Sequence, residues 1–171
     1  MVFVLTSNEP SGRDQPKTVY RIASKTNGMG IFVDDAVINH QLPTAPIQRV
    51  RPIYCANVQV SDLEAYNLPN FNLPADVPGL NRISFTVQDH GPIDSFHRLE
   101  LKFLADTNTT ISANAEEVRK LGATGYSTIL GFLSGTEYRS ELDCDYDNFD
   151  YVEELQIRVQ SYERFWIPYC D

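Results

Sequence analysis

An acidic stretch near the end of the chain contains the best candidate ligands for a metal ion. Its carboxylates stand at the first, third, fifth and twelfth places of a twelve-residue window, the ligand spacing of an EF-hand calcium loop: Asp143, Asp145, Asp147 and Glu154. However, Asp150 stands at the eighth place, where that loop has an apolar anchor, and the residues that follow alternate as in a strand. We therefore favour a solvated acidic loop and keep a calcium site as the alternative.

A second group of titratable residues lies in the middle of the chain. Asp89, His90, Asp94 and His97 place two imidazoles and two carboxylates within nine residues. Such groups can bind a transition metal or carry acid–base chemistry, and they suggest a small hydrolase as a third hypothesis. Asp, Gly and Pro are also the ordinary residues of turns, and we favour that explanation.

No serine or cysteine stands in a pattern typical of a catalytic nucleophile, so we expect a protein that is not an enzyme. The three cysteines are odd in number and widely spaced, which favours free thiols in a reducing compartment: Cys55, Cys144 and Cys170. The apolar start, Met1–Leu5, is too short for the core of a signal peptide, and no stretch has the length of a membrane span. We expect a protein that is made in the cytoplasm and then built into a particle.

Strict alternation of apolar and polar residues is the main structural signal. Three stretches show it, around Ile83–Val87, Leu99–Phe103 and Leu155–Val159. Each predicts a strand with one solvent-exposed face and one buried face, as in antiparallel sheets. The predicted fold is a single β-rich domain over residues 1–171, either all-β or β-dominated α+β. We expect an antiparallel sandwich or barrel with long proline-rich loops.

One short helix is predicted at about 114–121, where Asn114 and Glu117 fit a capping box and Gly122 follows. Two hairpins are also expected. The first joins strands at Thr18–Ser24 and Ile31–Ile38 around Asn27-Gly28, and the second joins Arg82–Gln88 to Phe96–Leu104. Further strands are expected at Val2–Leu5, Val50–Val60 and Leu155–Tyr162.

Residues 61–80 are predicted to form an extended, proline-rich arm or loop, because Pro69, Pro74 and Pro78 disfavour a helix. The arm is too apolar to run free in water. It either packs across its own sheet or lies on a neighbouring subunit. The candidate partner-binding residues come from this arm and from the aromatic end of the chain: Leu68, Phe71, Leu73, Trp166 and Tyr169.

The chain of 171 residues has a formal net charge of −9, which argues against binding to nucleic acid or to anionic lipid. The chain has ten Arg but only four Lys, together with nine Tyr and nine Phe. This composition is typical of protein interfaces. We therefore predict an acidic structural subunit that binds other protein subunits or itself. Capsid, decoration and tail proteins of viruses and phages have these features. By analogy of fold alone, we predict that this chain is such a protein. The alternative is a β module that binds calcium, or a carbohydrate at its aromatic end.

Overall fold

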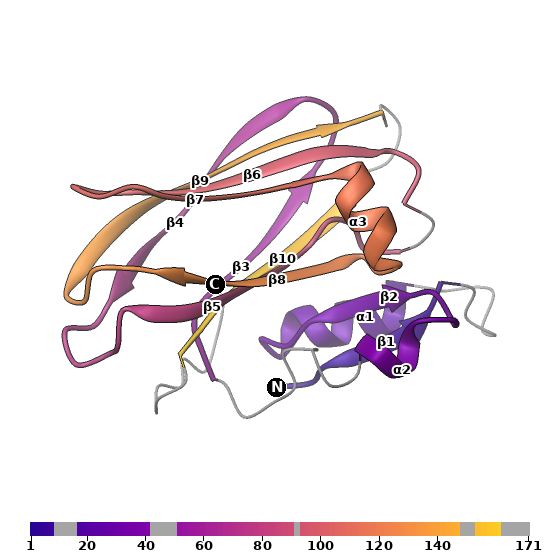
Figure 1. The fold of residues 1–171 in the computed structure, drawn as a ribbon, viewed down its shortest axis with the longest axis horizontal. Coiled ribbons are helices and arrows are strands. Elements are labelled where there is room, and N and C mark those ends of the chain that lie inside the picture. Colours follow the sequence, from indigo (N-terminus) through magenta and orange to yellow (C-terminus); the bar gives the residue numbers. More distant parts are fainter. Residues whose placement is uncertain (9–16, 42–50, 91–92, 148–152, 162–171) are drawn as a thin grey trace.

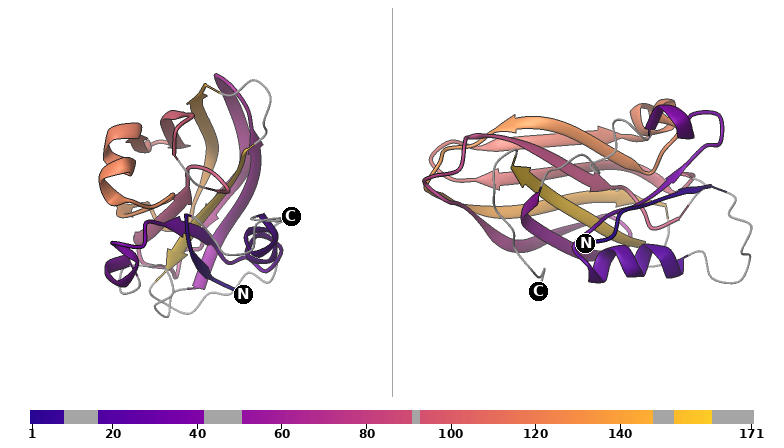
Figure 2. Two further views of the ribbon diagram at one scale, coloured as in Figure 1. Left: turned by 90° about the vertical axis from the view of Figure 1, so that its right-hand side faces the viewer. Right: turned by 90° about the horizontal axis from the view of Figure 1, so that it is seen from below.

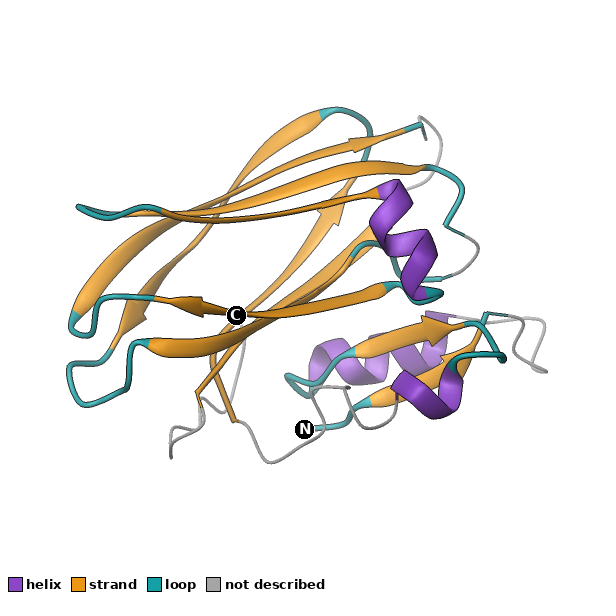
Figure 3. Ribbon diagram, viewed as in Figure 1, coloured by secondary structure: helices purple, strands orange, loops and turns teal. Residues whose placement is uncertain are grey.

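Two four-stranded antiparallel sheets form a β-sandwich in the computed structural model, which confirms the predicted fold class (Figures 1 and 3). The structure describes residues 1–8, 17–41, 51–90, 93–147 and 153–161. The first sheet has the order β3-β10-β5-β8, formed by Arg51–Val60, Glu153–Ser161, Leu80–Thr86 and Gly125–Gly131. The second sheet has the order β4-β9-β6-β7, formed by Glu64–Leu73, Thr136–Tyr146, Phe96–Leu104 and Thr109–Asn114.

A small α/β unit precedes the sandwich and packs against the first sheet (Figure 2). Its strands β1 (Val4–Ser7) and β2 (Gly30–Val33) are parallel, and the helix α1 (Lys17–Lys25) connects them. A four-residue helix, α2 (Ile38–Gln41), follows. We call β1, α1, β2 and α2 the N-terminal unit.

The predicted strand at Thr18–Ser24 is wrong, because this segment is the helix α1. Its buried residues, Tyr20, Ala23 and Ser24, follow the spacing of one helical face. The Asn-Gly pair that suggested a hairpin ends this helix instead. Asn27 adopts the left-handed conformation with a φ of 59°, and the amide of Gly28 donates to the carbonyl of Ala23. The predicted strand Ile31–Ile38 is correspondingly shorter.

The helix α3 (Ala115–Leu121) confirms the prediction for residues 114–121. The side chain of Asn114 accepts from the amide of Glu117, whose carboxylate accepts in turn from the amide of Asn114. Gly122 closes the helix in the left-handed conformation. Both helix caps could be predicted from the sequence because they depend only on neighbouring residues.

The second predicted hairpin is wrong, although both of its strands exist. β5 belongs to the first sheet and β6 to the second, so the residues between them cross from one layer of the sandwich to the other. β5 pairs with β10 and β8, and β6 pairs with β7 and β9. Strands that are neighbours in sequence therefore do not pair here.

Half of the proline-rich segment 61–80 is the strand β4. β4 pairs with β9, and the register shifts between Leu68 and Phe71, where Pro69 lies. A bulge accommodates the proline, which has no amide hydrogen to donate to a ladder. Leu68, Phe71 and Leu73 lie on this strand and are buried in the hydrophobic core of the chain.

Aromatic side chains fill the core between the two sheets. Phe71 has no exposed surface and lies 5.1–5.9 Å, between ring centroids, from four other rings. These rings belong to both layers and to the segment after β8: Tyr54, Phe103, Phe132 and Tyr138. Because Phe71 contacts all four, it is the centre of this cluster.

Cys55 is disulfide-bonded, so the expectation of free thiols was wrong for this residue. Cys144 is free and buried on β9. Cys170 lies outside the described residues. None of the helices in the described ranges has the length and apolar character needed to cross a membrane.

Candidate functional site

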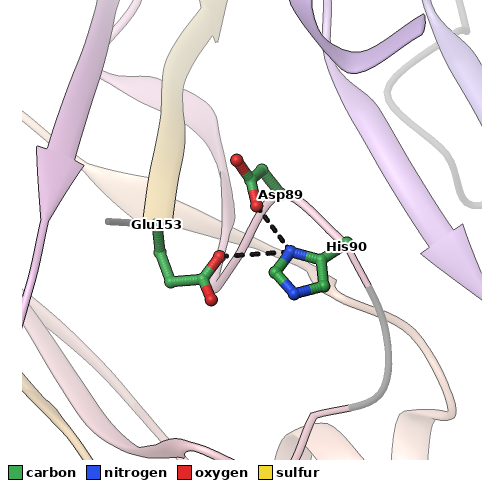
Figure 4. A group of neighbouring side chains, drawn as sticks. All are labelled: Asp89, His90 and Glu153. Atoms are coloured by element: carbon green, nitrogen blue, oxygen red, sulfur yellow. Dashed lines mark hydrogen bonds and ion pairs between the residues drawn. The ribbon is translucent and has the colours of Figure 1, made fainter. Parts of the chain in front are cut away.

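The candidate site lies where the loop after β5 meets the start of β10 (Figure 4). Asp89 and His90 follow β5, and Glu153 is the first residue of β10. Lys17, the first residue of α1, contacts the same group. The site therefore joins the first sheet of the sandwich to the N-terminal unit.

The imidazole of His90 lies between two carboxylates. Its Nδ1 atom is 2.7 Å from Oδ1 of Asp89 and 3.4 Å from Oε2 of Glu153. The other oxygen of Asp89, Oδ2, is 3.0 Å from Nζ of Lys17. Asp89 and Glu153 are buried, with 3% and 2% of their surface exposed, whereas a third of the His90 side chain is exposed.

The environment shifts the pKa values of Asp89, His90 and Glu153. Burial, followed by a hydrogen bond with Asp89, raises the pKa of Glu153 to about 7. Burial also acts to raise the pKa of Asp89, but hydrogen bonds with His90, Glu153 and Lys17 outweigh it and hold that pKa below its usual value. The hydrogen bond with Asp89 raises the pKa of His90. Asp89 is thus the charged carboxylate, and Glu153 is the one that accepts a proton near neutrality.

The sequence had grouped Asp89 and His90 with Asp94 and His97, and the structure separates these pairs. Asp94 is exposed. His97 lies on β6, with Nε2 2.6 Å from Oδ2 of Asp147, and both side chains are exposed. The two imidazoles have different partners and form no common site.

The acidic stretch does not fold as one loop. Asp143 and Asp145 lie on β9, where Arg98 on the neighbouring strand contacts both, at 3.4 and 3.7 Å. Glu154 lies on β10 and accepts a hydrogen bond from Ser24 of α1. Residues 148–152 lie outside the described residues. Calcium binding by this stretch stays a prediction.

Of the five residues predicted to bind a partner, three are described by the structure and two are not. Leu68, Phe71 and Leu73 are 7, 0 and 0% exposed, so in this conformation they are not available to another protein. Trp166 and Tyr169 lie outside the described residues. The exposed large apolar side chains of the sandwich lie elsewhere, and they include Leu80 and Ile129 on the first sheet.

Sequence reasoning missed Glu153 and Lys17 as members of the site. Lys17 is 72 residues before Asp89, and Glu153 is 64 residues after it, so no local spacing connects them. The acidic stretch did contain Glu153, but the EF-hand spacing selected Glu154, its neighbour. Because the side chains of a strand alternate between its faces, that difference of one residue changes the face.

The fold is that of a two-layer antiparallel β-sandwich preceded by a parallel β-α-β unit. The chain belongs to the family described as "Domain of unknown function (DUF7154)", whose profile matches residues 56–162. The match begins within β3 and covers the remaining strands of the sandwich, together with α3. The N-terminal unit lies outside it.

No curated protein matches the chain. Among solved structures, the P-domain of Macrobrachium rosenbergii nodavirus is similar, with a TM-score of 0.33 and 11% sequence identity. The alignment covers 64% of this chain and 95% of the nodavirus chain.

Proposed function

We propose that this chain is a non-enzymatic structural module that self-associates through the open edge of its first sheet. The observation that carries the proposal is the strand β8, which ends the order β3-β10-β5-β8 and pairs only with β5 among the described strands. An unpaired edge presents backbone groups to which a further strand can bind. In a stable monomer, such an edge is usually protected.

The edges on the opposite side of the sandwich are protected in the usual ways. β3 carries Pro52, and β4 carries Pro69 with a shift in register. β8 contains neither a proline nor a charged residue, and its register with β5 continues without a shift from Leu80 to Thr86. The neighbouring edge, β7, contacts β8 through a hydrogen bond from the Thr109 hydroxyl to the Gly131 carbonyl.

The pairing with β5 determines which backbone groups of β8 face outward. Val87 donates to Thr124, and the amide of Phe132 donates to Gly79, so alternate residues between them bond to β5. The backbone groups of Ser127 and Ile129 are therefore directed to the open edge. The Ile129 side chain is 50% exposed, and that of Leu80, on the same outer face, is 65% exposed.

A second copy of this chain suits the edge because of its charge. Copies with a net charge of −9 repel one another over most of their surface. β8 is uncharged, so two copies can pair it antiparallel without placing like charges opposite one another. Pairing would also cover the exposed Ile129 side chains of both copies.

Light scattering over a range of protein concentrations tests the proposal. We expect the mass of the wild-type protein to rise with concentration, and Ile129→Lys to reduce this association at least tenfold by placing like charges in the paired edge. Leu63→Lys is the matched control, because Leu63 is 64% exposed but lies between β3 and β4. A wild-type protein that stays monomeric, or equal effects of the two variants, would overturn the proposal.

The more specific form of the proposal is that this chain is a capsid, decoration or tail protein of a virus or phage particle. Electron microscopy of the concentrated protein tests it. Closed shells or tubes would support this form. Dimers that do not grow further would support self-association but contradict assembly into a particle by this chain alone.

A further inference from the structure

We propose that Asp89, His90 and Glu153 form a binding site for a divalent transition metal, with zinc as the probe ion. The three residues each present one ligand atom, and these atoms lie within 4.8 Å of one another. This is the one such group of three among the residues that the structure describes. The site is separate from the β8 edge and does not depend on self-association.

The distances between ligand atoms are close to those that an ion requires. A tetrahedral zinc ion, with bonds of about 2.0–2.1 Å, holds its ligand atoms roughly 3.4 Å apart. Nδ1 of His90 already lies 3.4 Å from Oε2 of Glu153. Its separation of 2.7 Å from Oδ1 of Asp89 must widen by a few tenths of an ångström. A third of the His90 side chain is exposed, which leaves it room for this adjustment.

Glu153 provides an independent sign that a ligand belongs here. Its side chain is 98% buried and points toward His90, as Figure 4 shows. The Glu153 carboxyl shares a hydrogen bond with Asp89, yet its Oε2 atom has no hydrogen-bond partner among the described groups, and the ionic contact of Oε2 is the imidazole at 3.4 Å. A buried carboxylate oxygen without a hydrogen bond costs free energy, and a metal ion at the centre of the group would satisfy it.

The donor set indicates the class of metal. One imidazole nitrogen and two carboxylate oxygens suit zinc and similar first-row ions better than calcium, which takes six to eight oxygen ligands. The exposed third of His90 gives an ion a path from solvent. Three protein ligands leave one position for water, and Lys17, whose Nζ lies 3.0 Å from the outer oxygen of Asp89, places a positive charge beside the site.

Isothermal titration of the metal-stripped protein with zinc chloride tests the site. We expect one ion per chain, and at least a roughly 100-fold weaker affinity in His90→Ala, since even outer-shell changes cost 10- to 100-fold. His97→Ala is the matched control, because that imidazole pairs with Asp147 outside the site. No binding by the wild-type protein, or unchanged binding in His90→Ala, would overturn the proposal.

Two further measurements keep the test independent of folding. The protein loaded with Co²⁺ should show the visible absorption of a low-coordinate ion, and His90→Ala should lose it. Lys17→Met removes a positive charge beside the metal and should tighten zinc binding by about tenfold, whereas Lys120→Met, an exposed lysine on α3, should not. An absent cobalt spectrum, or weaker zinc binding in Lys17→Met, would contradict the assignment.

Discussion

The guanidinium of Arg158 donates a hydrogen bond to the carbonyl oxygen of Gly28, with 3.0 Å between Nε and oxygen. Arg158 lies on β10 in the sandwich, and Gly28 lies in the N-terminal unit. The same side chain donates to the carbonyl of Ala56 and to the side chain of Asn57. Burial lowers the pKa of Arg158 to about 10, which leaves it charged at neutral pH. A buried cation thus attaches the N-terminal unit to the first sheet.

We expect Arg158→Ala to destabilise the protein by about 3 kcal/mol, because several carbonyl and amide acceptors lose their donor in a buried place. Chemical denaturation measures this loss, and hydrogen exchange should show greater opening of α1 than of β6. Arg139→Ala is the control, since Arg139 is exposed on β9. Equal effects of the two changes would contradict this role of Arg158.

The burial of Phe71 also has a measurable consequence. We expect Phe71→Ala to cost about 4 kcal/mol, because it leaves a cavity among the rings of the core. Leu63→Ala, in the same proline-rich segment but 64% exposed, should change the free energy of unfolding by less than about 0.5 kcal/mol. If instead Phe71→Ala keeps its stability and loses only self-association, the segment lies on a neighbouring subunit.

The alternation of apolar and polar residues predicted the strands well. It did not predict which other parts of the chain cover the faces of the sheets. On β6, Leu99 is buried and Arg98 is exposed, as a one-sided sheet requires. On β10, Gln156 and Arg158 alternate with apolar residues and yet are fully buried. The reason is that the N-terminal unit lies on this face and supplies polar partners, such as the amide of Gly30 and the hydroxyl of Ser24 for Gln156.

Local sequence patterns could not predict contacts between residues that lie far apart in the chain. Asn27-Gly28 fits a hairpin turn and a helix end equally well, and only tertiary packing decides between them. Gly28 is required by a close approach, since a Cβ atom there would lie 1.7 Å from the carbonyl oxygen of Val2. In the candidate site, Asp89 and His90 were recognised together because they are adjacent, whereas Glu153 reaches them only through the pairing of β10 with β5.

The raised pKa of Glu153 makes stability depend on pH in the metal-free protein. A carboxyl group whose pKa is about 7 when folded and 4.5 when unfolded stabilises the fold fully below pH 4.5. That contribution is lost as the pH rises through 7. His90, whose pKa is raised by Asp89, acts in the same direction at higher pH, whereas Asp89, with its lowered pKa, loses its contribution only in acid.

We therefore expect the wild-type protein, in EDTA, to lose roughly 2 kcal/mol of unfolding free energy between pH 5 and pH 7.5. Glu153→Gln keeps the neutral form at every pH and should flatten this dependence. Urea denaturation across the range measures both. Glu137→Gln, an exposed carboxylate on β9, should keep the wild-type slope. A Glu153→Gln protein with that same slope would show that Glu153 does not titrate in this range.

The thiol of Cys144 should be unreactive until the protein unfolds. Burial, assisted by the charge of Asp143, raises its pKa to about 12, so only about one molecule in 10⁴ carries the thiolate at pH 8. The residue also has no exposed surface. Iodoacetamide at pH 8 should therefore label the native protein at least 1000-fold more slowly than the unfolded protein.

Mass spectrometry without a reductant identifies the labelled residue. In guanidinium chloride we expect label at Cys144 and none at Cys55, because Cys55 is disulfide-bonded. Addition of a reductant should then expose Cys55 to the reagent, and Cys144→Ser should show no label at position 144 or, before that addition, at Cys55. Rapid labelling of Cys144 in the native protein would mean that β9 opens far more often than its central place in the second sheet allows.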